Sequence, residues 1–187
     1  MNGSCIPQYS PNYLESVYIV KVREKEGRSI DVIKKAVSRR AAVALSGKDS
    51  LVALHLALSA SVDVDVVINA YVADRRLPQS VVDELADIAR RLGAHVVIYD
   101  RAWDVHASLF NIIANHYGYG VIISGLRRRE NRGHNEIEYY RWGLLVNPII
   151  DWTVAEVWSY IYKHNLPVPS VYCSALFPET SLQHLVP

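Results

Sequence analysis

The sequence predicts an α/β fold, with a doubly wound, mainly parallel sheet and helices on both of its faces. Three observations carry this prediction. Short apolar segments rich in β-branched residues recur along the chain, segments with helical spacing separate them, and polar loops follow them. Parallel strands joined by helices form right-handed crossovers that cover both sheet faces, which is a Rossmann-like arrangement.

The first part of the chain is predicted to be an irregular arm followed by a strand. Residues 16–23 (SVYIVKVR) alternate loosely between apolar and polar types, as a strand does. Residues 30–40 (IDVIKKAVSRR) place apolar side chains on one side of a short helix. We therefore expect an N-terminal arm and strand over residues 1–28 and a single α/β domain over residues 29–187.

From residue 41 onward the pattern becomes regular. Strands are expected at residues 41–45 (AAVAL), 64–72 (VDVVINAYV), 94–99 (AHVVIY) and 120–124 (GVIIS). Helices are expected at residues 51–60, 78–92, 103–117 and 154–164. Pro78 suits the first turn of a helix, and Gly93 suits the position after its end.

Composition excludes several classes of protein. The chain has 187 residues, of which 50% are hydrophobic and 21% are charged, as in a globular domain. A net charge of +1 argues against extensive nucleic-acid contact, so we do not expect an RNA partner. No apolar run approaches the roughly 20 residues that span a bilayer. The N-terminus lacks a signal-peptide pattern, so we expect a soluble cytoplasmic protein with no membrane partner.

Cysteine and histidine usage gives no sign of a protein-bound metal. The two cysteines, Cys5 and Cys173, are too few for a disulfide framework or for a four-cysteine zinc or iron–sulfur site. The seven histidines show no metal-binding spacing. We therefore predict neither a bound metal nor an iron–sulfur cluster.

The loop after the strand at 41–45 has the features of an anion site. It reads Ser46, Gly47, Lys48, Asp49, Ser50 and leads into a helix. The glycine permits close backbone approach, the helix start offers free N–H groups, and the hydroxyls and the lysine add donors and charge. This is not a Walker A loop, because Asp follows the lysine. The aspartate could hold the loop through backbone N–H groups or help to place a metal.

A second loop, after the strand at 120–124, is rich in arginine. It reads GLRRRENRG from Gly125 and includes Arg127, Arg128, Glu130 and Arg132. Arginine suits bidentate recognition of phosphate or sulfate. Ligands of doubly wound sheets bind beyond the carboxyl ends of the strands, so both loops are expected to face one crevice.

A third segment is predicted to be a packing helix. Thr153 and Glu156 form a T-x-x-E capping box, which is a strong helix start. The aromatic residues that follow are expected in the core rather than against a ligand.

Together the three segments resemble the phosphoadenosine phosphosulfate (PAPS) reductase family, within the adenine nucleotide alpha-hydrolase-like superfamily. The first loop is similar to the S-G-G-x-D-S pyrophosphate loop, although it is one residue shorter. The second is similar to G-[LIA]-R-R-x-E, matched by Gly125, Arg127, Arg128 and Glu130. The third is similar to the family's P-I-x-D-W-T-x-x-E-V-W-x-Y-I segment, followed by L-P-x-P and Tyr172.

This resemblance implies a nucleotide-binding α/β domain that takes ATP, adenosine phosphosulfate (APS) or PAPS, with magnesium accompanying ATP. It implies that the first loop binds phosphate or sulfate and that Gly125, Arg127, Arg128, Glu130 and Arg132 hold a second anionic group. Lys48, Arg127 and Arg128 are then the catalytic candidates. Further implied partners are a thioredoxin-like reductant or a catalytic partner subunit, and a homodimer is left open.

The sequence departs from typical reductases at the nucleophile. Their E-C-G-[LI]-H tail is absent from these residues, and Cys173 stands at a different place. Three functions therefore stay open: sulfonucleotide reduction or a related sulfur transfer, with Cys173 as nucleophile; adenylyl transfer with pyrophosphate release, as in the small subunit of ATP sulfurylase or in FAD synthetase; and nucleotide sensing without catalysis.

Overall fold

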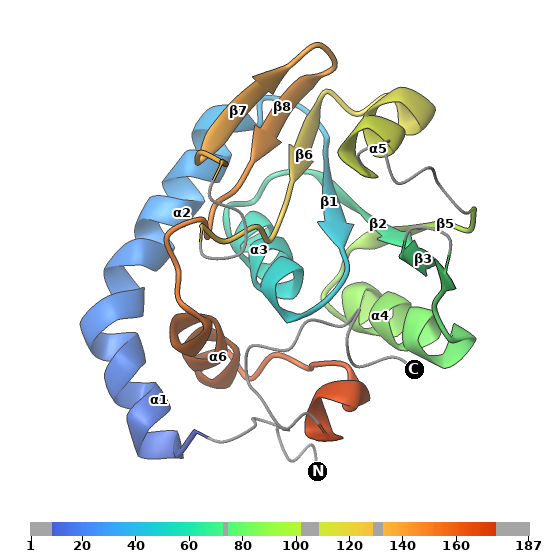
Figure 1. Cartoon of the computed structure of the whole chain (residues 1–187). Helices are drawn as coiled ribbons and strands as arrows, with labels where there is room; N and C mark the ends of the chain where they lie inside the picture. The colour runs from blue at the N-terminus through green and yellow to red at the C-terminus, as the bar shows by residue number, and fades with distance from the viewer. Residues whose placement is uncertain (1–8, 73–74, 102–108, 129–132, 175–187) are drawn as a thin grey trace.

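A six-stranded sheet forms the centre of the computed structural model, which describes residues 9–72, 75–101, 109–128 and 133–174 (Figure 1). The strand order is β5-β2-β1-β6-β8-β7, and every neighbouring pair is parallel except β7 with β8. The strands are β1 Ala41–Leu45, β2 Val64–Asn69, β5 His95–Tyr99, β6 Val121–Ile123, β7 Ile137–Tyr140 and β8 Gly143–Val146. The predicted α/β fold with a mainly parallel sheet is confirmed.

Helices cover both faces of this sheet. The helical segments are α1 Pro11–Val17, η1 Tyr18–Val22, α2 Arg23–Ala36, α3 Lys48–Ser59, α4 Gln79–Arg91, α5 Leu109–Tyr117, α6 Val154–Lys163 and η2 Ser170–Ser174. Buried residues of α1, α2, α3, α4 and α6 form one core cluster. Buried residues of α5 pack with Ala42, Ala44 and Leu145 in a second cluster. The doubly wound arrangement follows from these two layers.

The strand expected at residues 16–23 is wrong, because this segment is helical. It spans the end of α1, the π-helical turn η1 and the start of α2. Val17 and Val22 are both buried, whereas Ile19 and Val20 are exposed. A π turn has more residues than an α-helical turn, so Val17 and Val22, five positions apart, lie on the same buried face. This spacing does not fit the usual helical period, and the segment was therefore interpreted as a strand. The expected domain boundary at residue 28 falls within α2, and the division of the chain there stays a prediction.

Other differences concern where elements begin and end. The helix expected at 30–40 is the end of α2, which stops at Ala36, and the strand expected at 64–72 divides after Asn69. The short ribbon of β3 Tyr71–Val72 and β4 Arg75–Arg76 follows it. The helix expected at 103–117 is observed from residue 109 onward, as α5, and its first residues lie outside the described part of the chain. The β7–β8 hairpin was not predicted, because its residues are half exposed and follow no clear period.

The helix after the first loop begins earlier than expected. Its first residue is Lys48 rather than Leu51, so three of the five loop residues form the first turn of α3. This matters for the site, because the first turn carries the backbone N–H groups that have no partner within the helix.

The strand order places the topological switch beside β1. From β1 the chain adds β2 and then β5 on one side, and later adds β6 on the other. The two predicted loops follow β1 and β6, the strands that flank this switch, where doubly wound sheets bind ligands. Among the residues that the structure describes, none of the helices combines the length and apolarity that crossing a bilayer requires.

Candidate functional site

The loop after β1 is held together by the side chain of Ser50. Its Oγ accepts hydrogen bonds from the backbone N–H groups of Ser46 at 2.9 Å and Gly47 at 3.0 Å. The same hydroxyl donates to the carbonyl oxygen of Gly47 at 3.0 Å. The Ser50 hydroxyl, which the sequence suggested as a donor to an anion, is therefore used within the loop. The side chain of Ser46, the first residue of the loop, is exposed.

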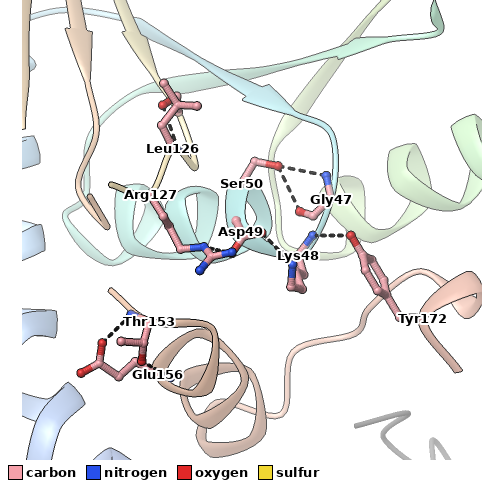
Figure 2. Close-up of polar contacts among 10 residues, drawn as sticks. Gly47, Lys48, Asp49, Ser50, Leu126, Arg127, Thr153, Glu156 and Tyr172 are labelled. Atoms are coloured by element: carbon pink, nitrogen blue, oxygen red, sulfur yellow. Dashed lines mark hydrogen bonds and ion pairs between the residues drawn. The ribbon is translucent and has the colours of Figure 1, made fainter. Parts of the chain in front are cut away.

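Two buried cations converge on Asp49 (Figure 2). Lys48, which is 0% exposed, places its Nζ 2.9 Å from Asp49 Oδ2. Arg127, which is 2% exposed, places its Nε 2.8 Å from Asp49 Oδ1. The second contact is close enough for an ion pair, but it lacks the alignment of a hydrogen bond. The residues on which the two predicted loops converge are thus Lys48, Asp49 and Arg127.

Asp49 makes two ion pairs that the sequence did not suggest. It bridges the lysine before it and the arginine of the second loop, while its suggested role in placing a metal stays a prediction. A buried lysine or arginine requires such a partner, since an unpaired charge away from water is strongly unfavourable. The cation side chains are therefore held beside the N-terminus of α3.

Gly125 brings the second loop directly against the first. A Cβ atom on Gly125 would lie 2.3 Å from the backbone nitrogen of Ser50 and 2.5 Å from the carbonyl carbon of Asp49. No side chain fits in that space. Glycine at this position is what permits Arg127, two residues later, to reach Asp49.

A buried asparagine fixes the loop after β6. Asn147 accepts from Ser124 Oγ at 2.6 Å, and its Nδ2 donates to the carbonyl oxygen of Asn135 at 2.6 Å and to Glu138 at 3.0 Å. Ser124 Oγ also accepts from the backbone N–H of Leu126 at 3.2 Å. Asn147 was not singled out from the sequence, because an isolated asparagine carries no pattern.

Arg128, which the sequence also predicted in the site, does not join the cluster. Arg128 is exposed and pairs through Nε with Asp151 Oδ1 at 2.9 Å. Its backbone N–H donates to the carbonyl oxygen of Ile150 at 2.7 Å. Glu130 and Arg132 lie outside the described residues.

The third segment packs as predicted. Thr153 caps α6 by accepting from the backbone N–H of Glu156 at 3.3 Å, and Glu156 accepts from the N–H of Thr153 at 2.6 Å. Lys25 of α2 adds an ion pair with Glu156 at 2.9 Å. Trp158 and Tyr160 are fully buried, which agrees with their expected place in the core.

Tyr172 reaches the site from η2. Its hydroxyl accepts from the backbone N–H of Lys48 at 3.2 Å. The sequence pointed to this tyrosine only through the family resemblance, since nothing local predicts a contact across 124 positions. The next residue, Cys173, is exposed and disulfide-bonded, so it carries no thiol in this structure. The other cysteine, Cys5, lies outside the described residues.

A further buried charge lies in β2, away from this cluster. Asp65 is 1% exposed and accepts from Arg40 at 2.5 Å, from His95 at 2.8 Å and from Tyr119. Burial alone would raise the pKa of Asp65, but the hydrogen bonds from Tyr119, His95 and Arg40 outweigh it and hold that pKa below its usual value. Burial and the bond to Asp65 raise the pKa of Tyr119. This group stabilises the fold.

The structure defines an α/β protein in which two loops meet beyond the ends of β1 and β6, and sequence comparison shows what the chain is similar to. The model of the phosphoadenosine phosphosulfate reductase domain matches residues 111–176. Adenosine 5'-phosphosulfate reductase of Geobacillus thermodenitrificans is 37% identical over 71 residues, which cover 30% of this chain and 30% of that protein. Over residues 111–176 the chain is thus similar to the PAPS reductase family, which supports the resemblance of the sequence motifs.

A longer alignment extends over both loops. Sulfate adenylyltransferase subunit 2 of a Sulfurovum species is 25% identical over 204 aligned positions, covering 82% of this chain and 67% of that protein. The chain thus spans about two thirds of the adenylyltransferase subunit, while its match to the APS reductase spans less than a third of that protein.

Solved structures share the fold. A PAPS reductase from Candida auris in a phosphate complex superposes with a TM-score of 0.56 and 15% identity, over 88% of this chain and 91% of that one. An NMN synthetase from Francisella tularensis gives a TM-score of 0.57 and 11% identity, over 88% and 80% of the two chains. At this level of identity the likeness concerns the fold alone.

Proposed function

We propose that this protein binds an adenine nucleotide and transfers its adenylyl group to or from sulfate, with the phosphates at the N-terminus of α3. The observation that carries the proposal is the convergence of Lys48 and Arg127 on Asp49 beside that helix end. Two cations and a positive helix dipole, all beyond the carboxyl end of β1, suit a di- or triphosphate.

Adenylyl transfer fits this chemistry because it requires charge stabilisation rather than a protein nucleophile. A sulfate oxygen bonds to the α-phosphorus of ATP while the bond from that phosphorus to the bridging oxygen breaks. Pyrophosphate then leaves with the electron pair. Lys48, Arg127 and the first-turn N–H groups would face the charge that builds on the leaving group and lower the barrier. Magnesium would arrive with ATP, and Asp49 is the site carboxylate that could meet it.

Two further observations favour this reaction over reduction. The relative aligned over most of this chain is by name a sulfate adenylyltransferase subunit. Cys173 is disulfide-bonded and offers no thiolate while it stays so. Because that relative is by name a subunit, the proposal includes a partner subunit.

The first test is a thermal-shift panel with ATP plus magnesium, APS, PAPS and 3′,5′-ADP. A ligand at 100 times its dissociation constant stabilises a protein by about 2.7 kcal/mol, which gives a readable shift in Tm. Arg127→Gln should abolish that shift. Arg91→Gln, which changes an exposed arginine paired with Asp87 along α4, should leave it intact. No shift with any ligand would contradict the proposal.

Turnover then separates the reactions. With ATP, sulfate and magnesium we expect pyrophosphate release, which Arg127→Gln removes. Binding of ATP without any turnover, with or without a partner subunit, would instead favour a nucleotide-sensing role.

A second candidate is sulfonucleotide reduction. It is favoured by the position of Cys173, directly after the tyrosine that contacts Lys48. Once reduced, its thiolate could attack the sulfur of APS or PAPS, forming a sulfur–sulfur bond and releasing the nucleotide phosphate. A thioredoxin-like dithiol would then release sulfite and become oxidised. Sulfite formation that requires such a dithiol and that Cys173→Ser abolishes would establish this reaction, whereas adenylyl transfer should survive the substitution.

A further inference from the structure

Tyr172 covers the first turn of α3 with both its hydroxyl and its ring. The hydroxyl accepts from the backbone N–H of Lys48 at 3.2 Å, and Lys48 Nζ lies 5.8 Å from the centre of the ring (Figure 2). Tyr172 is 2% exposed, and its ring packs edge-on against Trp158 of α6 with centroids 5.8 Å apart. The tyrosine therefore holds a defined position over the end of the helix.

The backbone group that Tyr172 engages is one that an anion would use. The N–H groups of Ser46 and Gly47 are already bonded to Ser50 Oγ, so the donors available to a ligand start with Lys48. Anions at helix N-termini accept from these first-turn N–H groups. The Tyr172 hydroxyl therefore stands where a phosphate or sulfate oxygen would accept.

The segment that carries Tyr172 is held both in the core, through the tyrosine ring and the disulfide of Cys173, and at its surface. η2 is a five-residue 3₁₀ helix, a form with poorer hydrogen-bond geometry than an α-helix. Its first residue, Ser170, is held by Glu84 of α4 through two exposed hydrogen bonds of 2.8 and 3.0 Å. Exposed hydrogen bonds such as these open locally at low free energy, so this end of η2 is where the segment can yield when the hydroxyl is displaced.

We infer that Tyr172 is a positioning residue that competes with the anion for the backbone N–H of Lys48. In the unliganded protein the tyrosine satisfies this donor and closes the helix end. When a phosphate or sulfate binds, its oxygen takes the donor, the hydroxyl leaves, and η2 shifts with it. The inference rests on the anion site proposed above, and it makes occupancy of that site detectable at η2.

The decisive variant is Tyr172→Phe, which removes the hydroxyl and keeps the ring against Trp158. Titration calorimetry with inorganic pyrophosphate should show binding about fivefold to tenfold tighter than in the wild type, because the anion no longer displaces a hydrogen bond. Tyr140→Phe is the matched control, since it removes a hydroxyl that bonds to Glu138 on β7, and it should leave the affinity unchanged.

Hydrogen exchange provides a readout that a purely structural tyrosine would not change. The N–H of Tyr172 donates to the carbonyl oxygen of Pro169 at 3.0 Å. Pyrophosphate should speed exchange across residues 169–174 while slowing it across residues 46–50. In Tyr172→Phe the exchange at 169–174 should already be fast without the ligand.

The outcomes are distinct. Pyrophosphate affinity that is unchanged or weaker in Tyr172→Phe, or slower exchange at 169–174 on binding, would overturn the competition while leaving the anion site in place. Failure of both the wild type and the variant to bind pyrophosphate or any of the nucleotides would overturn the anion site itself, and the competition with it.

Discussion

Gly125 lies so close to Ser50 that a methyl group on the glycine would sit 2.3 Å from the serine backbone nitrogen. This contact joins the loop after β6 to the first turn of α3. It brings together two segments of a candidate site that are about 75 positions apart in the chain, and it sets the distance that Arg127 must span to reach Asp49.

Gly125→Ala should therefore separate the two loops. We expect the free energy of unfolding to fall by about 1–3 kcal/mol, because the added methyl group meets backbone atoms that cannot move aside. We also expect pyrophosphate binding to weaken at least tenfold, measured by titration calorimetry. Gly27→Ala is the control: nothing lies within 4 Å of its Cβ in α2, and alanine there should raise stability slightly. Normal binding by Gly125→Ala would contradict this account of the contact.

The sheet and the place of the site were predictable from the sequence, because both depend on local patterns. The β-branched strand segments and the polar loops behind them gave the order of elements, and parallel topology then put both loops at one edge. The capping box at Thr153 was likewise predictable, since both of its partners lie within one turn. In each of these cases the interaction is encoded in neighbouring residues.

Features that depend on distant contacts could not be predicted. The pairing of Asp49 with Arg127 joins two loops, and the bond from Lys48 to Tyr172 joins α3 to η2. The π turn at Tyr18–Val22 was mistaken for a strand, because only the buried partners of Val17 and Val22 reveal the helical face. The periodicity of a sequence reports local secondary structure and does not show which distant residues come into contact.

Asp49→Asn tests whether the aspartate serves chiefly to hold the two cations. The amide keeps the size but loses the charge, so Lys48 and Arg127 lose a shared counter-charge. We expect the unliganded protein to lose about 1–3 kcal/mol of stability. Pyrophosphate should then raise Tm by more than in the wild type, because the anion supplies the missing charge. Asp87→Asn, in an exposed pair with Arg91, should change stability by less than about 0.5 kcal/mol. A smaller ligand shift in Asp49→Asn would argue against this role.

Asp65 should make stability depend on acid pH. Its pKa is lower in the folded protein than the ordinary value of about 3.9 expected in the unfolded chain. Its contribution is therefore fully present above that unfolded value and is lost as the pH falls through the folded pKa. Asp65→Asn should lower the urea midpoint at pH 7, and the difference from the wild type should shrink below about pH 4. Asp63→Asn, at an exposed neighbour, should change the profile little. A pH-independent difference would refute the assignment.

Thr153→Ala should separate the stability of α6 from the function of the site. Loss of the N-cap hydroxyl typically costs about 1 kcal/mol, because the N–H of Glu156 loses its acceptor. For a chain of this length that corresponds to a Tm lower by about 2–4 °C. Thr153→Ser keeps the hydroxyl and should recover most of the loss. Pyrophosphate affinity should stay within about twofold in both variants at 25 °C, where the protein remains folded. If Thr153→Ala weakens binding much more than this while Thr153→Ser does not, the α6 cap also positions the anion site, and α6 has a larger role there than core packing.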